Sequence, residues 1–398
     1  MSYLSQRVNA LPESPSIALT NQASALKNQG YQVVSLAAGN PEMETPRAVK
    51  EAAEQSVWHH QMGYQPVSGL ASLRQAVVDR YAREYGIDFD ADQVTITTGA
   101  KHSLYNIFQC LIDPADEVIV ITPYWVSYPS IIQLAQGKTV LVESQVQDDF
   151  QLPVANILAA ITERTKAIVI NSPHNPTGVV YHQQRLKALA QGLQAHPNVM
   201  VITDEIYDQV YWQDKPVHLA QVAPELKDRL ILVNGVSKNY AMAGWRVGFT
   251  IGPKPVIEAI NRLQSQSISC VNGVAQCAAT AALALTASDL APMVQTYQQQ
   301  VSQAVKRLQP LGMKIVPPSG TFYVFANIEN IMEQWGFADD MAFCQALLKN
   351  QHVAVLPGSA CGMPGYIRVS CGAQSDAFEL GLDRIEQFLQ TQQKVSNE

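Results

Sequence analysis

A lysine and an arginine eight residues apart are the side chains of this sequence best suited to covalent and anion chemistry. Lys238 follows the apolar run 230–236, which reads as a buried strand. Partial burial lowers a lysine pKa and makes the neutral amine available for Schiff-base chemistry. Arg246 lies between Gly244 and Gly248, where its guanidinium could donate two parallel hydrogen bonds to a phosphate. On residue types alone, a lysine and an arginine on a surface loop fit the same pattern.

The elements that would position these side chains alternate between strands and helices. Further apolar runs precede polar turns and helical patterns, at Gln93–Thr97, Glu117–Ile121, Lys166–Ile170 and Val199–Ile202. Strands that alternate with helices indicate right-handed crossovers. We therefore expect an α/β fold with a mostly parallel sheet and helices on both faces.

The pattern changes near Thr286. A long helix follows, then short strands at 320–325 and 366–369, and a last helix that begins at Ser375 with a good N-cap residue. These features predict a smaller α+β domain, completed by the N-terminal arm with its short strand at 33–36. The predicted boundaries are 46–286 for the large α/β domain, with 1–45 and 287–398 forming the small one.

Three more motifs follow predicted strands of the large domain, where ligands bind in open parallel sheets. Thr98–Lys101 begins a helix, so its free N–H groups could bind an anion, although an ordinary turn fits as well. Asn171–Gly178 is an irregular loop that could present Asn175 inward. Asp204 ends a buried strand and needs a cationic partner, unless it caps the next helix.

Taken together, the four motifs resemble those of the pyridoxal-phosphate aminotransferases of fold type I, the aspartate aminotransferase family, over essentially the whole chain. The resemblance implies that Lys238 binds the cofactor covalently and moves the proton during catalysis. It implies cofactor contacts from a set of residues spread over the large domain: Gly99, Ala100, Lys101, Trp125, Asn175, Asp204, Tyr207, Ser237, Arg246 and Tyr64. In that set, Asp204 would pair with the ring nitrogen, and Trp125 would stack on the ring.

The same resemblance implies a substrate site and a dimer. Arg368 and Gly39 would bind the α-carboxylate, with Trp125 and Asn175 beside them, although an arginine in a strand is more often a solvated edge residue. Lys101 would reach a distal carboxylate, because 267–275 lacks the partner arginine of another branch. Tyr64 would contact the phosphate of a neighbouring subunit, which implies a homodimer with shared active sites.

Composition agrees with an enzyme of this kind. The 398 residues are 47% hydrophobic and 15% charged, with a net charge of -7, which argues against nucleic acid as a partner. The six cysteines form no CxxC pair, and no histidine pair has metal-ligand spacing. The first residues lack the apolar core of a signal peptide. We expect a cytoplasmic protein that binds neither a metal nor a membrane.

The predicted activity is a ping-pong transamination from an L-amino acid, with aspartate or glutamate favoured, to 2-oxoglutarate or oxaloacetate. Alternatives that share the cofactor contacts are an aminotransferase for aromatic or neutral amino acids or prephenate, and a carbon–sulfur β-lyase. A cofactor-sensing regulator is a further alternative, but we expect no room for a DNA-binding domain before Gly39.

Overall fold

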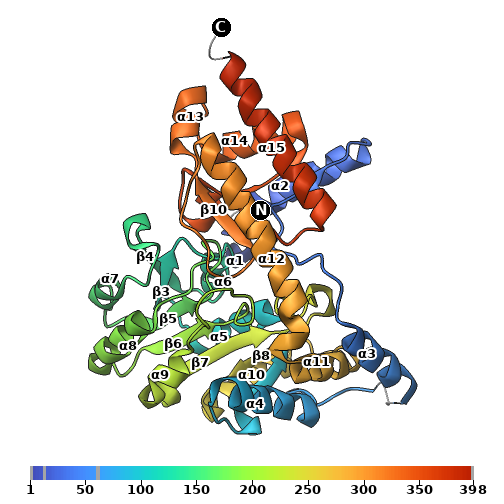
Figure 1. The fold of residues 1–398 in the computed structure, drawn as a ribbon. Helices are drawn as coiled ribbons and strands as arrows, with labels where there is room; N and C mark the ends of the chain where they lie inside the picture. Colours follow the sequence, from blue (N-terminus) through green and yellow to red (C-terminus); the bar gives the residue numbers. More distant parts are fainter. Residues whose placement is uncertain (1–2, 12–14, 60–62, 396–398) are drawn as a thin grey trace.

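The structure is a computed structural model that describes residues 3–11, 15–59 and 63–395. Figure 1 shows two layered regions, a larger one built on a twisted sheet and a smaller one above it, with the long helix α12 (Ala287–Leu308) running from one to the other. Short 3-10 turns lie at 91–93, 146–148, 193–195, 224–229, 243–245, 309–311 and 358–361.

The large region contains a seven-stranded sheet in the order β2-β8-β7-β6-β5-β3-β4. Its strands are β2 (Val94–Thr97), β3 (Glu117–Thr122), β4 (Lys138–Glu143), β5 (Thr165–Asn171), β6 (Met200–Asp204), β7 (Leu230–Gly235) and β8 (Gly248–Ile251). Only β8 runs against its neighbours. The mostly parallel sheet is therefore confirmed, and the reversed strand β8, which directly follows the Lys238–Arg246 stretch, was not predicted.

Both faces of this sheet are covered, so successive strand residues enter different cores. In β7, Leu230 and Leu232 pack on one side, while Ile231 and Val233 pack on the other. The second side is covered by α5 (Ala100–Leu111), α6 (Tyr128–Leu134) and α10 (Lys254–Ser265). The first is covered by α3 (Arg47–His59), α4 (Ala71–Tyr85), α7 (Val154–Ala159), α8 (Gln183–Gly192), α9 (Leu219–Val222) and α11 (Gly273–Ala284). This burial explains the continuous apolar runs of the sequence.

The small region has an antiparallel sheet in the order β12-β13-β10-β9 and a parallel pair, β1-β11. Its strands are β1 (Val34–Ser35), β9 (Lys314–Ile315), β10 (Tyr323–Asn327), β11 (Val353–Ala354), β12 (Leu356–Pro357) and β13 (Tyr366–Ser370). Its helices are α2 (Pro15–Asn28), α13 (Glu329–Trp335), α14 (Asp340–Gln351) and α15 (Ser375–Val395), and α1 (Gln6–Asn9) lies against α6 of the large region. β10 begins later than predicted because Thr321 has a left-handed φ of 62°.

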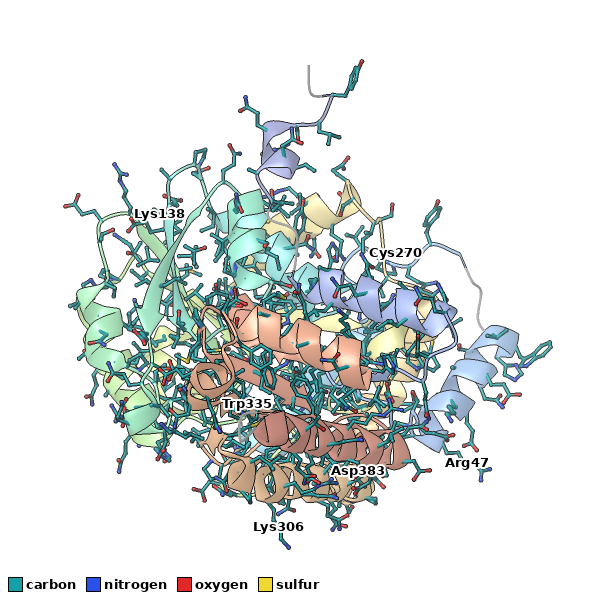
Figure 2. All side chains as sticks on the ribbon, turned by 90° about the horizontal axis from the view of Figure 1, so that it is seen from above. Arg47, Lys138, Cys270, Lys306, Trp335 and Asp383 are labelled. Carbon is teal, nitrogen blue, oxygen red and sulfur yellow. The ribbon has the colours of Figure 1, made fainter. Side chains whose placement is uncertain are left out.

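Helix α12 belongs to both hydrophobic cores. Leu290 near its start packs in the large core, and Val301 packs in the small one. Near its end, Arg307 forms ion pairs of 2.6–3.1 Å with three carboxylates of α15, one of them Asp383. Figure 2 shows the neighbouring Lys306 at the outer edge of the molecule. The domain boundaries at 46 and 286 stay a prediction.

Among the described helices none is alone long and apolar enough to cross a membrane, and only the pair α11–α12, bent by 93°, reaches that length together.

Candidate active site

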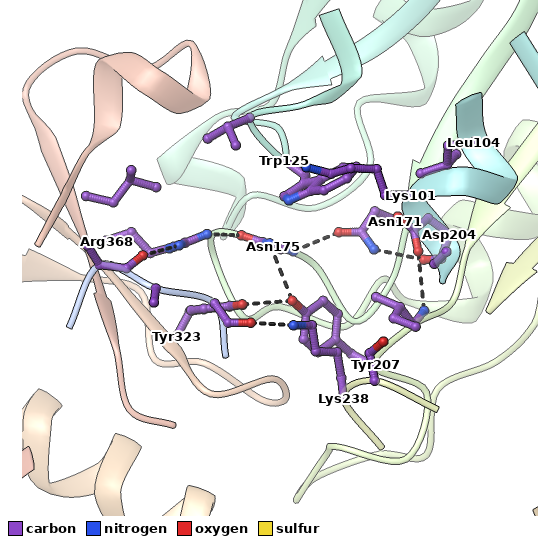
Figure 3. A pocket seen from close by; sticks show the side chains of 18 of the residues that line it. Lys101, Leu104, Trp125, Asn171, Asn175, Asp204, Tyr207, Lys238, Tyr323 and Arg368 are labelled. Carbon is purple, nitrogen blue, oxygen red and sulfur yellow. Dashed lines mark hydrogen bonds between the residues drawn. The ribbon is translucent and has the colours of Figure 1, made fainter. Parts of the chain in front are cut away.

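A cavity of about 360 Å³ lies where β5, β6 and β7 end, facing the small region. Figure 3 shows Arg368 and Asp204 at opposite ends of it, with Trp125 on one side and Lys238 and Tyr207 on the other. Its lining includes these predicted site residues: Gly39, Ala100, Lys101, Trp125, Asn175, Asp204, Tyr207, Ser237, Lys238, Arg246 and Arg368. Parts of the chain up to 329 residues apart, from Gly39 to Arg368, thus meet in one pocket.

Lys238 is the reactive amine of the pocket. It follows β7, and its Nζ donates to the carbonyl oxygen of Gly39. Burial, followed by the cationic side chains of Arg368, Arg246 and Lys101, lowers the pKa of Lys238 to about 8. A lysine with this pKa is partly neutral near physiological pH and can attack a carbonyl carbon.

Asp204 is the last residue of β6 and is 4% exposed. The Tyr128 hydroxyl, at the start of α6, donates to its Oδ2 at 2.7 Å. Within the described ranges, Asp204 has no ion pair with a lysine, arginine or histidine, and burial raises its pKa to about 6. A buried carboxylate without an ion pair is suited to bind a cationic group of a ligand. Tyr128 was not predicted, although it lies three residues after Trp125.

An anion site lies beside these two groups. Gly99 caps the start of α5 with a φ of 83°, and the guanidinium of Arg246 lies so close that a Cβ on Gly99 would be 2.6 Å from its Nη2. A Cβ on Gly248 would be 2.5 Å from the Ala100 backbone nitrogen, so the glycine lets β8 approach α5 closely. The free N–H groups of α5, the Ser237 hydroxyl and Arg246 can together bind a phosphate.

Two tyrosines connect the two ends of the pocket. The hydroxyl groups of Tyr207 and Tyr323 are 2.8 Å apart, and Asn175 Nδ2 is 3.5 Å from the Tyr207 oxygen. The Asn175 backbone N–H donates to Asn171 Oδ1 at 2.8 Å. This bond fixes the conformation of the loop 171–178, which the sequence predicted to be irregular. Tyr323 and Asn171 were not predicted, although both lie in motifs that the sequence singled out.

Arg368 lies on β13, between β12 and β10, and is only 5% exposed, so the alternative of a solvated edge residue is wrong. Its Nη1 donates to Asn175 Oδ1 at 2.9 Å, and its Nη2 donates to the Ala37 carbonyl at 2.7 Å. The guanidinium carbon is 4.4 Å from the centre of the Tyr323 ring. Its buried Nε has no hydrogen-bond partner among the described residues. A cation held in this way is suited to a substrate carboxylate.

Lys101 and Trp125 form the outer wall. The Lys101 Nζ is 5.0 Å from the centre of the Trp125 ring, and burial followed by Arg246 lowers the pKa of Lys101. The apolar part of the wall was not predicted and comes from Ala37, Ala38, Leu104, Val126, Ile206 and Leu356. Two of the predicted residues do not line this cavity: Gly99, which caps the start of α5, and Tyr64, which is 94% exposed.

Comparisons with known proteins agree with this geometry. The model of the family "Aminotransferase class I and II" matches residues 31–385. The chain is 38% identical to an aspartate aminotransferase of Bacillus subtilis and 36% identical to an aspartate/prephenate aminotransferase of Nitrosomonas europaea, in each case over 97% of this chain and 99% of the relative.

Solved structures agree as well. The aspartate aminotransferase of Thermus thermophilus with maleate is 36% identical, with a TM-score of 0.90 over 97% of this chain and 100% of that one. The aspartate aminotransferase of Rhizobium meliloti gives a TM-score of 0.92 at 33% identity, over 98% and 99% of the two chains. The predicted fold type is confirmed, and the chain belongs to the class I and II aminotransferases.

Proposed function

We propose that this aminotransferase binds pyridoxal 5'-phosphate in the cavity at Lys238 and transfers the amino group of aspartate or glutamate to 2-oxoglutarate or oxaloacetate. The observation that carries the proposal is the joint position of Lys238, Asp204 and Arg368 in one pocket. The relatives named above, several of which are called aspartate aminotransferases, support the choice of acidic substrates.

The pocket fits the four polar parts of this cofactor. The α5 N-terminus, Ser237 and Arg246 would hold the phosphate, and the buried Asp204 carboxylate would pair with the ring nitrogen. The amine of Lys238 would take the aldehyde, and Tyr207 and Asn175 would donate to the ring oxygen. When bound, the cofactor supplies an aldehyde for the amino group and a ring that accepts the electron pair from the substrate α-carbon.

The protein's own part of the reaction is binding, orientation and proton transfer. Arg368 and the backbone at Gly39 would bind the α-carboxylate, which fixes the substrate α-carbon near Lys238. The neutral Nζ of Lys238 would then remove the α-proton as a general base and return it as a general acid. Asp204 would keep its charge beside the ring because it then has the cationic partner it lacks in the protein alone.

Borohydride reduction of the purified protein, which should be yellow, tests the cofactor proposal. The reduced cofactor should be attached to the peptide that contains Lys238, and a label elsewhere would overturn the proposal. A panel of amino donors with 2-oxoglutarate and pyruvate as acceptors then tests the substrate. Release of pyruvate and ammonia from cysteine-type substrates would instead indicate the carbon–sulfur β-lyase.

A second substrate class is supported by the apolar wall formed by Leu104, Val126 and Leu356. These side chains could bury the ring of an aromatic amino acid or of prephenate. The Nitrosomonas europaea relative is named an aspartate/prephenate aminotransferase. Comparable kcat/KM values for aspartate and for an aromatic donor would favour this broader activity.

We also propose a homodimer with shared active sites. Tyr64 and Arg246 are exposed in the single chain, and Tyr64 projects from the protein surface. In a dimer, Tyr64 would reach the phosphate in the partner's pocket. The cytoplasmic location stays a prediction.

Tyr64→Phe should then weaken cofactor binding by about 1.5–3 kcal/mol, because it removes one hydrogen bond to a charged group. Equilibrium release of the cofactor, followed by absorbance, measures this change. Tyr31→Phe is a suitable control, since Tyr31 is also exposed but contacts His352. A fully active monomer at assay concentration would contradict the dimer.

A further inference from the structure

The segment Asp204–Asp208 has two functional sides. Asp204 and Tyr207 line the active-site cavity. Glu205 and Asp208 instead point into a cluster of buried polar side chains on the side of α4. A shift of this segment would therefore move the groups that face the cofactor site together with those in the cluster.

Asp208 is the centre of the cluster and is fully buried. Its Oδ2 accepts hydrogen bonds from Arg80 Nη2 at 2.7 Å and from the Tyr85 hydroxyl at 2.9 Å. Its Oδ1 accepts one from Asn239 Nδ2 at 2.6 Å. Arg80 neutralises the charge inside the protein, so Asp208 stays paired even if one of the neutral donors is lost.

Asn239 connects this cluster to the reactive lysine. It directly follows Lys238 and is fully buried. Besides donating to Asp208, its Oδ1 accepts from the backbone N–H of Gln209 at 3.2 Å. The two bonds, in opposite directions, join the loop after β7 to the segment after β6. Both polar ends of the Asn239 amide are thus used, which fixes its orientation.

The Nζ of Lys238 has one hydrogen bond in the described structure, to the Gly39 carbonyl. The next residue, Asn239, ties the backbone of this loop to the segment after β6. We propose that Asn239 is a positioning residue that holds Lys238 in register with Asp204 and Tyr207 through its paired hydrogen bonds to Asp208 and Gln209. This inference rests on the proposed role of Lys238.

The test compares Asn239→Ala with Tyr85→Phe. Each variant removes a neutral donor from the same carboxylate and leaves the Arg80–Asp208 ion pair in place, but only the first frees the loop of Lys238. Asp208→Ala would be a poor choice, because it leaves Arg80 buried without its partner. Both chosen variants should lower the unfolding midpoint by a few degrees.

The first readout is the titration of Lys238 in the cofactor-free protein, followed by pH-dependent acetylation and peptide mass spectrometry. In Asn239→Ala the lysine should become better hydrated, so its midpoint should rise by about half a pH unit or more. The second readout is steady-state kinetics of the holoenzyme, in which kcat should fall about tenfold while KM changes less than about threefold. Tyr85→Phe should leave the titration midpoint of Lys238 and kcat as in the parent protein.

An unchanged Lys238 midpoint in folded Asn239→Ala, or an equal shift in Tyr85→Phe, would overturn the inference. If Asn239→Ala does not fold, Asn239→Ser removes the paired bonds with a smaller loss of polar character and is read in the same way. Failure of borohydride to label Lys238 in the parent protein would overturn the proposed function instead, so the two outcomes are distinguishable.

Discussion

The two ends of the active-site cavity are built in different ways. At the cofactor end, Asp204, Ser237 and Lys238 all lie where strands of one parallel sheet end or in the turn that follows. At the substrate end, Arg368 comes from the small region and Gly39 from the N-terminal segment, 199 residues before Lys238. The sheet fixes the first set relative to one another, whereas the second set depends on how the two regions pack.

The ends also differ in how their charges are satisfied. Burial shifts the pKa values of Asp204 and Lys238 toward their neutral forms, and neither forms an ion pair within the described part of the chain. Arg368 already donates to two protein acceptors. The cofactor end is therefore prepared for a ligand that supplies the missing charges, while the substrate end is held in shape before any carboxylate binds.

Loss of the lysine should be the largest effect. Lys238→Ala should keep the fold but lower kcat by about a thousandfold or more, because no second base among the described residues that line the cavity is placed to move the α-proton. Lys101, the other lysine of the cavity, lies over the Trp125 ring instead. The measurement is steady-state turnover with aspartate, with Lys254→Ala as a surface control. Turnover above about one per cent of the parent would contradict the assignment.

The pH dependence of cofactor capture should be the next largest effect. Only neutral Lys238 reacts with an aldehyde, and below its pKa of about 8 the neutral fraction falls tenfold for each pH unit. Capture of pyridoxal phosphate by the cofactor-free protein should thus slow about fiftyfold from pH 8, where half of Lys238 is neutral, to pH 6. Stopped-flow absorbance measures it.

Nα-acetyl-lysine in water is the control for that experiment, with an expected break near pH 10.4. If the capture rate of the protein also changed slope near that high pH, burial would not lower the pKa of Lys238. We expect the capture rate to fall more steeply below about pH 6, where Asp204 becomes protonated.

The contrast between the two ends also explains what the sequence could predict. Asp204 and Lys238 follow apolar runs that are recognisable as buried strands, so their position at one edge follows from parallel topology. Arg368 and Gly39 depended on the family resemblance, since no local pattern indicates that they meet.

Tyr128 and Tyr323 were missed because their function depends on the partners of their hydroxyl groups, which lie on other elements. The Tyr128 hydroxyl contacts Asp204, and the Tyr323 hydroxyl contacts Tyr207. Gly320–Phe325 was recognised as a strand, but a strand pattern does not distinguish a core tyrosine from one that lines a ligand cavity. Asn239 was missed for the same reason, because its partners at 208 and 209 belong to another loop.

Lys101 should show a smaller and selective effect. Lys101→Ser should cost acidic substrates about 1–3 kcal/mol in kcat/KM, because a single ammonium group contacts the distal carboxylate. Aromatic donors should change little. The control is Lys306→Ser, since Lys306 is exposed on α12 and does not line the cavity. Equal losses for aspartate and an aromatic donor would instead assign Lys101 to the cofactor phosphate.

Tyr323 connects the two ends, so its substitutions should give the smallest effects and the sharpest test of their difference. Tyr323→Phe removes the hydroxyl next to Tyr207 but keeps the ring beneath Arg368. Cofactor binding should weaken by about 0.5–1.5 kcal/mol, as expected for one neutral hydrogen bond, while KM for aspartate stays unchanged.

Tyr323→Leu also removes the ring, and with it a cation–π contact of about 0.5–2 kcal/mol, so KM for aspartate should now rise as well. Cofactor release and steady-state kinetics separate the two effects. Tyr207→Phe and Tyr323→Phe together form a double-mutant cycle. The effect of Tyr207→Phe on cofactor binding should be smaller when Tyr323 is already Phe. If Tyr323→Phe raised KM as much as Tyr323→Leu does, the hydroxyl would act on the substrate end directly. The two ends would then behave as one coupled site rather than as separate parts.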